Sequence, residues 1–210
     1  MPRLARLLAC AVVAGSLALP ALAQGQSPVK IAELSARLFE AGQQARDPLL
    51  MVAAAKLRKT LAPQQTERRA EGGEATSEAP LDWQEMLAEA EALATEDDTL
   101  LGLIEDVRAE TTKGVATGPV YNIGKIANGR TDTYPRVDFI GGEYAEIYVE
   151  AKGATDLNLT VIDAQGRLVC SDTDSSHIAY CGWRPDQTAP FQITVTNRGP
   201  NGVTYALMTN

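Results

Sequence analysis

The sequence has little histidine and lacks the common catalytic motifs. Among its 210 residues there is one histidine, His177, and there is no Gly-x-Ser-x-Gly, His-Glu-x-x-His or glycine-rich phosphate loop. Ser175 and Ser176 adjoin His177, but a Ser-His-Asp triad needs a base and a nucleophile that come from separate elements. We therefore predict that the protein is not an enzyme, and we name no catalytic residue.

Long apolar runs are also missing, except near the start. Arg3 and Arg6 precede an apolar segment at 7–19, and an Ala-Leu-Ala sequence ends at Ala23. This order is typical of a secretory signal peptide, which we place at 1–23. The run is shorter than the ~20 residues that span a bilayer. We predict an exported protein, periplasmic or secreted, with no integral membrane segment after the signal is removed.

The chain has fewer basic residues than acidic residues. The formal net charge is -8, and removal of the signal takes away Arg3 and Arg6 but no acidic residue. This leaves 17 of the 19 Lys and Arg residues against 27 Asp and Glu, a net charge of -10. An acidic surface is unsuited to binding phosphate backbones, so we predict no nucleic-acid partner. The predicted partner is an unknown protein or polymer.

Cysteine is equally scarce. Cys10 lies in the signal, so two cysteines remain, Cys170 and Cys181, in an oxidising compartment where a disulfide is the default state. Closing a loop of this size stabilises a fold by about 2.5–3 kcal/mol in the chain-entropy model. A redox-active pair would have Cys-x-x-Cys spacing, and a zinc site would need about four nitrogen or sulfur ligands. We predict a structural disulfide.

The two halves of the chain differ in composition. Two aromatic residues, Phe39 and Trp83, lie within 24–113, and the others lie within 114–210. The first half is rich in Ala, Leu and Glu, which favour helices, whereas the second half contains most of the glycines. We predict an α+β protein, with N-terminal α-helical hairpins at 24–113 followed by a C-terminal antiparallel β-sandwich at 114–210.

Four helices are expected in the first half, because four capping signals precede apolar residues at helical spacing. The signals are Ser27-Pro28, Asp47-Pro48, the capping-box pair Asp82 and Glu85, and Glu96-Asp97-Asp98. Gly114 is expected to close the last helix. Each helix has a single apolar stripe, so it must pack on another helix or on the second half. The segment 63–80 contains no large apolar residue and is predicted to be a disordered linker.

Residues in the second half alternate with the period of a strand. In the segment 143–151, Ala145, Ile147 and Val149 fall on one face, and polar or aromatic residues fall on the other. Segments 156–162 and 191–197 alternate in the same way. Strands at intervals of 8 to 12 residues with turns between them indicate an antiparallel sandwich.

Tyr144 and Tyr148 share the polar face of the first of these strands with Glu146 and Glu150. If this face is exposed, the two tyrosines form a docking patch; if the helices cover it, they pack between the two halves. We favour packing.

Four aspartates near strand ends are candidate calcium ligands: Asp156, Asp163, Asp172 and Asp174. Carboxylates are the hard oxygen ligands that calcium prefers, and a sandwich can bring strand ends together. Alternatively, these side chains bond local backbone N–H groups and make turns. No EF-hand loop is present, so we predict no cofactor and keep calcium as the alternative.

The second half resembles the bacterial pre-peptidase C-terminal domain family over about residues 117–210. The matching motifs are Gly141-Gly142-Glu143, Asp156-Leu157-Asn158-Leu159, Asp163 to Gly166, Asp172-Thr173-Asp174, Asn197-Arg198-Gly199 and Tyr205-Ala206-Leu207. The resemblance implies a jelly-roll-like sandwich of the kind found beside secreted peptidases, with calcium in some related collagen-binding domains, and no catalysis. The helical part resembles no family in this way.

Together these features predict an exported, non-enzymatic binding or accessory protein with an unknown partner. Two alternatives stay open. The sandwich could be a secretion or processing appendage that is shed after export, or the protein could be a hydrolase with a cleft between the helices and the sandwich.

Overall fold

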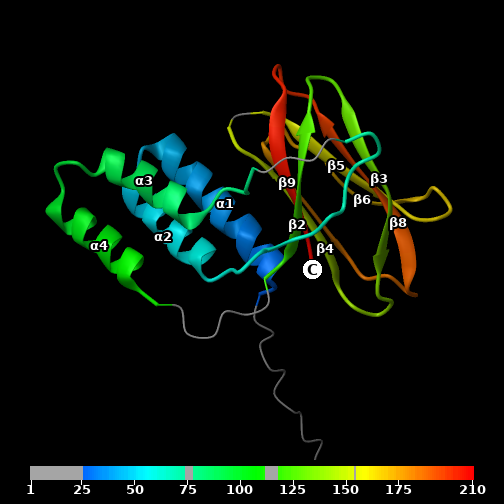
Figure 1. Ribbon diagram of the computed structural model, residues 1–210, viewed down its shortest axis with the longest axis horizontal. Coiled ribbons are helices and arrows are strands. Elements are labelled where there is room, and N and C mark those ends of the chain that lie inside the picture. The colour runs from blue at the N-terminus through cyan, green and yellow to red at the C-terminus, as the bar shows by residue number, and fades with distance from the viewer. Residues whose placement is uncertain (1–25, 74–77, 112–117, 154) are drawn as a thin grey trace, which may run out of the picture.

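A computed structural model describes residues 26–73, 78–111, 118–153 and 155–210 of the chain. The predicted signal peptide at 1–23 and the predicted boundary between 113 and 114 lie outside these residues. The helices are α1 (Pro28–Ala45), α2 (Pro48–Lys59), α3 (Trp83–Leu93) and α4 (Asp98–Ala109). The prediction of an α+β fold is confirmed, with the helices on one side and the strands on the other (Figure 1).

All four helices begin at the predicted signals. Ser27 accepts a hydrogen bond from the backbone N–H of Lys30 at 3.0 Å, and Asp82 forms a complete capping box with Glu85. The Asp47 side chain caps α2 and the Asp97 side chain caps α4, each by accepting hydrogen bonds from backbone N–H groups of the first turn. These caps satisfy N–H groups that have no partner within the helix. Helix α4 ends at Ala109, before the predicted Gly114.

In the described part of the chain, nine strands form two sheets. They are β1 (Gln64–Gln65), β2 (Val120–Ile126), β3 (Thr131–Phe139), β4 (Ala145–Ala151), β5 (Leu157–Ile162), β6 (Leu168–Asp172), β7 (Ile178–Trp183), β8 (Ala189–Asn197) and β9 (Val203–Thr209). The first sheet has the order β1-β2-β9-β4-β7 and the second has the order β3-β8-β5-β6. All strand pairs are antiparallel except β1 with β2.

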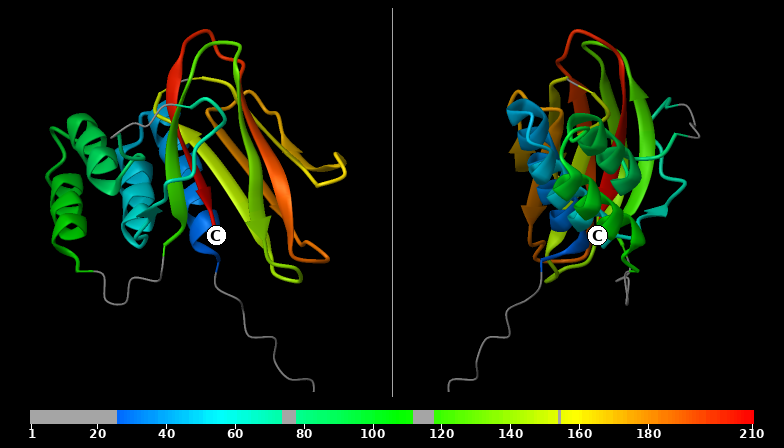
Figure 2. Two further views of the ribbon diagram at one scale, coloured as in Figure 1. Left: turned by 45° about the vertical axis from the view of Figure 1, so that its right-hand side comes forward. Right: turned by 90° about the vertical axis from the view of Figure 1, so that its left-hand side faces the viewer.

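Among the residues that the structure describes, three apolar clusters hold the layers together. The first lies between the two sheets and includes Ile147, Leu159 and Val195. The second is the interior of the helical bundle, and the third joins α1 to the outer face of the first sheet. Figure 2 shows that the helices cover only this sheet, which leaves the outer face of the second sheet uncovered by them. Strand β4 is therefore buried on both faces.

The prediction of a disordered linker at 63–80 is wrong for residues 64–73. Gln64 and Gln65 pair with β2, and the N–H of Glu71 donates to the carbonyl of Thr133 at 2.8 Å. Ala70 is buried in the core of the sandwich. The composition did not reveal this because backbone pairing at a sheet edge needs no large apolar side chain. In Figure 1 this segment, which follows α2 and precedes α3 in the chain, runs across the sandwich. Residues 74–77 lie outside the described part.

None of the helices that the structure describes is long and apolar enough to span a membrane.

Candidate functional site

The candidate functional site is a cleft on the side of the sandwich away from the helices. Its walls are the β5–β6 turn and the β7–β8 loop, and its volume is about 440 Å³. The β5–β6 turn projects from the sandwich on the side opposite the helices in Figure 1. Since small-ligand sites typically measure about 300–1,000 Å³, this cleft has the dimensions of a binding site.

Aromatic side chains form the floor of the cleft. Trp183 lies 4.9 Å from Phe139 and 5.2 Å from Phe191, centroid to centroid, and both contacts are edge-to-face. Trp183 and Phe191 line the cleft together with Val169. The indole N–H of Trp183 is buried and has no hydrogen-bond partner among the described residues. The edge-to-face contacts fix the Trp183 ring, so the apolar floor is preformed.

One wall is a self-supporting turn built around Asp163. Its carboxylate accepts hydrogen bonds from the backbone N–H groups of Gln165 and Arg167, both at 2.9 Å. The Arg167 Nε also donates to it at 2.6 Å. These bonds, led by the one from the Arg167 backbone, hold the pKa of Asp163 below its ordinary value. Asp163 therefore orders the turn and keeps Arg167 over the cleft.

The other wall is braced by the turn between β3 and β4. The N–H of Gly142 donates to the carbonyl of Pro185 at 2.7 Å, and Arg184 donates to the carbonyl of Gly142. A Cβ added at Gly141 would lie 2.6 Å from the backbone of Gln187, so only glycine fits at this approach. Gly141 and Gly142, from the first motif that resembles the pre-peptidase C-terminal domain family, thus position a wall of the cleft.

The cleft offers both charges and both hydrogen-bonding roles. Arg167 and Arg184 supply donors, whereas Asp186 supplies an acceptor and Gln187 supplies both. Within the described part of the chain, no hydrogen bond or ion pair engages the side chains of Asp186 and Gln187. The arrangement can bind and orient a polar molecule with an apolar face.

The sequence predicted one residue of this cleft, Asp163, in another role. The cleft joins two turns about 20 residues apart, and no local pattern shows that they meet. The one available signal was the presence of Trp, Arg, Asp and Gln within residues 183–187.

The predicted disulfide between Cys170 and Cys181 is present. It joins β6, an edge strand of one sheet, to β7, an edge strand of the other, with a Cα–Cα distance of 5.9 Å. Asp172 follows the bridge and accepts a hydrogen bond from the N–H of Tyr180 at 2.9 Å. The bridge therefore closes the open side of the sandwich near helix α1.

The candidate calcium ligands do not meet. Asp172 ends β6 and Asp174 lies in the loop that follows; each is 3.9 Å from the guanidinium of Arg37 on α1. Asp163 orders the β5–β6 turn, and Asp156 accepts a hydrogen bond from Asn158 at 2.8 Å. Among the described residues, no group of three or more His, Cys, Asp or Glu side chains is placed to hold a metal ion.

Calcium binding stays a prediction, and Arg37 provides its test. Burial and the neighbouring Asp172 carboxylate raise the pKa of Asp174, and Arg37 opposes this shift. A bound calcium ion would have to displace the guanidinium. We expect Arg37→Gln to show a larger calcium-dependent rise in melting temperature than the wild type, whereas Arg136→Gln, on the exposed β3 strand, should behave as wild type. Equal shifts in all three proteins would exclude binding at this loop.

Tyr144 and Tyr148 do not form an exposed docking patch. Tyr148 is 0% exposed and packs under α1, whereas Tyr144 is 47% exposed and is not part of that cluster. The face is covered because the neighbouring strands add Ile123, Ile178 and Met208 to it, and α1 buries its apolar stripe against them. The preferred alternative, packing between the two halves, describes Tyr148 and does not describe Tyr144.

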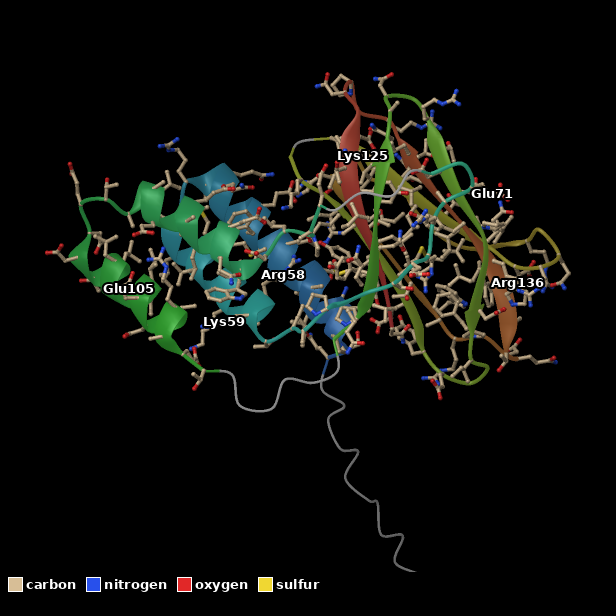
Figure 3. All side chains as sticks on the ribbon, viewed as in Figure 1. Arg58, Lys59, Glu71, Glu105, Lys125 and Arg136 are labelled. Atoms are coloured by element: carbon tan, nitrogen blue, oxygen red, sulfur yellow. A yellow bond between two sulfur atoms is a disulfide. The ribbon has the colours of Figure 1, made fainter. Side chains whose placement is uncertain are left out.

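A buried ion pair lies at the junction of helices and sheet. Arg58 on α2 donates two hydrogen bonds to the Glu150 carboxylate on β4, at 3.0 and 2.7 Å, and Tyr148 donates a third. Arg58 also donates to Ser35 and to the carbonyls of Ala32 and Leu81. Figure 3 shows Arg58 where the helices meet the sandwich.

The surroundings of this pair fix its charge state. Burial and the charge of Glu150 raise the pKa of Tyr148 well above its ordinary value, so its hydroxyl stays a donor. Burial alone would lower the pKa of Arg58, but Glu150 and Tyr148 together outweigh burial and the net shift is upward. The pair is fully hydrogen-bonded, as a buried ion pair must be.

A second cleft, of about 490 Å³, lies between the helices and the sandwich. Its acidic side chains have partners: Glu85 binds Lys152 at 2.8 Å and Glu89 accepts from Gln43 at 2.7 Å. Glu40 lies 3.6 Å from the Nδ1 of His177. These pairings make the cleft part of the junction between the halves.

Comparison with known proteins gives structural likenesses and no family assignment. No family model matches the sequence, and no curated protein matches it. The pre-peptidase C-terminal domain of a collagenase from Bacillus anthracis has a similar structure, with 12% identity and a TM-score of 0.39. The match covers 44% of this chain and 89% of that chain.

Two further solved structures show the breadth of these likenesses. PliG, a periplasmic inhibitor of g-type lysozyme from Aeromonas hydrophila, is 13% identical with a TM-score of 0.33, covering 48% of this chain and 91% of its own. A carbohydrate-binding module of a laminarinase from Zobellia galactanivorans is 11% identical with a TM-score of 0.29, covering 41% of this chain and 80% of its own. At these values the likenesses concern the general sandwich architecture.

Proposed function

We propose that the protein is an exported, non-enzymatic binding or accessory protein that holds its partner in the cleft between the β5–β6 turn and the β7–β8 loop. The observation that carries the proposal is the construction of this cleft. Its floor is a fixed aromatic cluster, and its walls are ordered by Asp163 and by the close approach of Gly141 to Gln187. A preformed cleft loses little conformational entropy on binding.

In this proposal the helices are a permanent cover for one sheet. Separating the halves would expose Arg58 and Glu150 and would disrupt the pairing of β1 with β2. A sandwich shed after export would leave these groups unpaired, so the geometry favours an exported protein in which both halves stay together. The uncovered side of the sandwich is then free for the partner.

Retention by the partner tests the proposal. The exported form of the chain is immobilised and exposed to the secreted proteins and the cell-envelope polymers of the cells that produce it. We expect wild type to retain a component that the double variant Arg184→Ala/Gln187→Ala does not retain. Arg136→Ala, a matched loss of an exposed arginine outside the cleft, should retain it.

Equal retention by the cleft variant and the wild type would place the binding surface elsewhere. A hydrolytic activity that a single substitution abolishes would contradict the non-enzymatic role.

A further inference from the structure

We infer that the cleft between the β5–β6 turn and the β7–β8 loop binds a neutral saccharide; this inference rests on the function proposed above. A sugar ring has a C–H face that is apolar and a rim of hydroxyl groups that both donate and accept hydrogen bonds. The cleft provides an apolar aromatic floor in Trp183 and Phe191 beneath walls of planar polar side chains. The apolar face of the sugar matches the aromatic floor of the cleft, and its hydroxyl rim matches the polar walls.

The charges of the cleft favour a neutral ligand. Each wall carries one arginine and one aspartate, Arg167 with Asp163 and Arg184 with Asp186, so the charges of the lining cancel. An anionic polymer would meet the Asp186 carboxylate and the acidic surface of a chain with net charge -8. A cationic ligand would meet the two guanidinium groups. Neither charged class gains from this lining.

The unused hydrogen-bonding groups suit hydroxyls. Arg167 uses its Nε on Asp163 and one terminal nitrogen on Gln165, at 2.6 and 3.4 Å, which leaves its other terminal nitrogen as a donor. Asp186 and Gln187 add acceptors from the facing loop. A hydroxyl needs a donor and an acceptor side by side, and planar guanidinium, amide and carboxylate groups provide both in fixed directions.

The shape of the lining argues against a peptide strand. A peptide that adds to a sheet needs an edge with free backbone groups as well as pockets for alternate side chains. Here the walls are loops with engaged backbone groups: Gly166 donates to Asp163 within the β5–β6 turn, and Gly142 of the β3–β4 turn donates to Pro185 of the β7–β8 loop. The two walls therefore offer a ligand mainly side-chain groups, which is how a saccharide is recognised.

Calorimetric titration of the exported form with defined oligosaccharides tests the inference. The neutral probes are cellohexaose, xylohexaose, mannohexaose and chitohexaose, and the charged comparators are hexagalacturonate and a chitosan hexamer. We expect at least one neutral probe to bind, with Kd at least about tenfold weaker in Arg184→Ala/Gln187→Ala, because two hydrogen bonds are lost. Arg136→Ala is expected to keep the wild-type Kd.

The outcomes separate this inference from the proposed function. Stronger binding of a charged comparator, or no binding of any neutral probe, overturns the saccharide inference, while loss of envelope or protein retention in the cleft variant still supports the proposed function. Neutral binding that is unchanged in Arg184→Ala/Gln187→Ala overturns the assignment of the saccharide to this cleft. Circular dichroism of the double variant checks that the loops remain on a folded sandwich.

Discussion

Replacing Glu150 with glutamine is expected to lower the free energy of unfolding by about 3–5 kcal/mol. The substitution keeps the shape of the side chain but removes the charge that compensates Arg58. The Arg58 side chain is only 5% exposed, so solvent can compensate little of its charge. Such a loss is a large part of the ~5–15 kcal/mol that stabilises a typical protein. Urea unfolding followed by far-UV circular dichroism measures it.

The matched control is the same substitution in an exposed ion pair. Glu110 binds Lys56 at 3.0 Å, and the two side chains are 46% and 59% exposed. Glu110→Gln should change the unfolding free energy by no more than about 1 kcal/mol, because solvent screens exposed pairs. A loss of equal size in Glu150→Gln and Glu110→Gln would show that burial of the Arg58 pair has no energetic role.

A double substitution separates the cost of an unpaired charge from the contribution of the pair itself. In Arg58→Met/Glu150→Leu both charges are absent, and apolar side chains occupy the junction. We expect this variant to be more stable than Glu150→Gln, because a buried pair replaced by apolar groups is often near neutral. The pair then acts mainly to fix the register of α2 on β4.

Signals that act over a few residues predicted the elements of the fold well. Ser27, Asp47 and Asp82 each lie within three residues of the N–H groups that they cap. The start of each of these helices is therefore determined by a few neighbouring residues. Alternation in β4, β5 and β8 depends on adjacent residues in the same way. These features could be derived because cause and effect lie within one turn or one strand.

Features that join distant segments could not be derived. Arg58 and Glu150 are 92 residues apart, and Arg58 lies in a basic last turn that suits the C-terminus of any helix. The strand at Gln64–Gln65 forms through backbone groups that every residue carries. The candidate cleft combines residues from two turns that a third turn supports. In each case the decisive partner is set by tertiary packing.

Removal of the disulfide is expected to lower the free energy of unfolding by about 3 kcal/mol. Cys170 and Cys181 have a sequence separation of 11, and closing a loop of that size destabilises the unfolded chain by about this amount in the chain-entropy model. The bridge also joins the edge strands of the two sheets. For a chain of this length, a loss of that size lowers the melting temperature by about 6–12 °C.

The double variant Cys170→Ala/Cys181→Ala tests this expectation by thermal unfolding with and without a reducing agent. Alanine is preferable to serine because Cys181 is 0% exposed in the sandwich core, where a hydroxyl would lack a partner. Reductant should lower the wild-type melting temperature toward that of the variant and should leave the variant unchanged. If the wild type melts at one temperature under both conditions while free thiols are detected, the bridge contributes nothing to stability, and the contact between β6 and β7 must hold the sheets together without it.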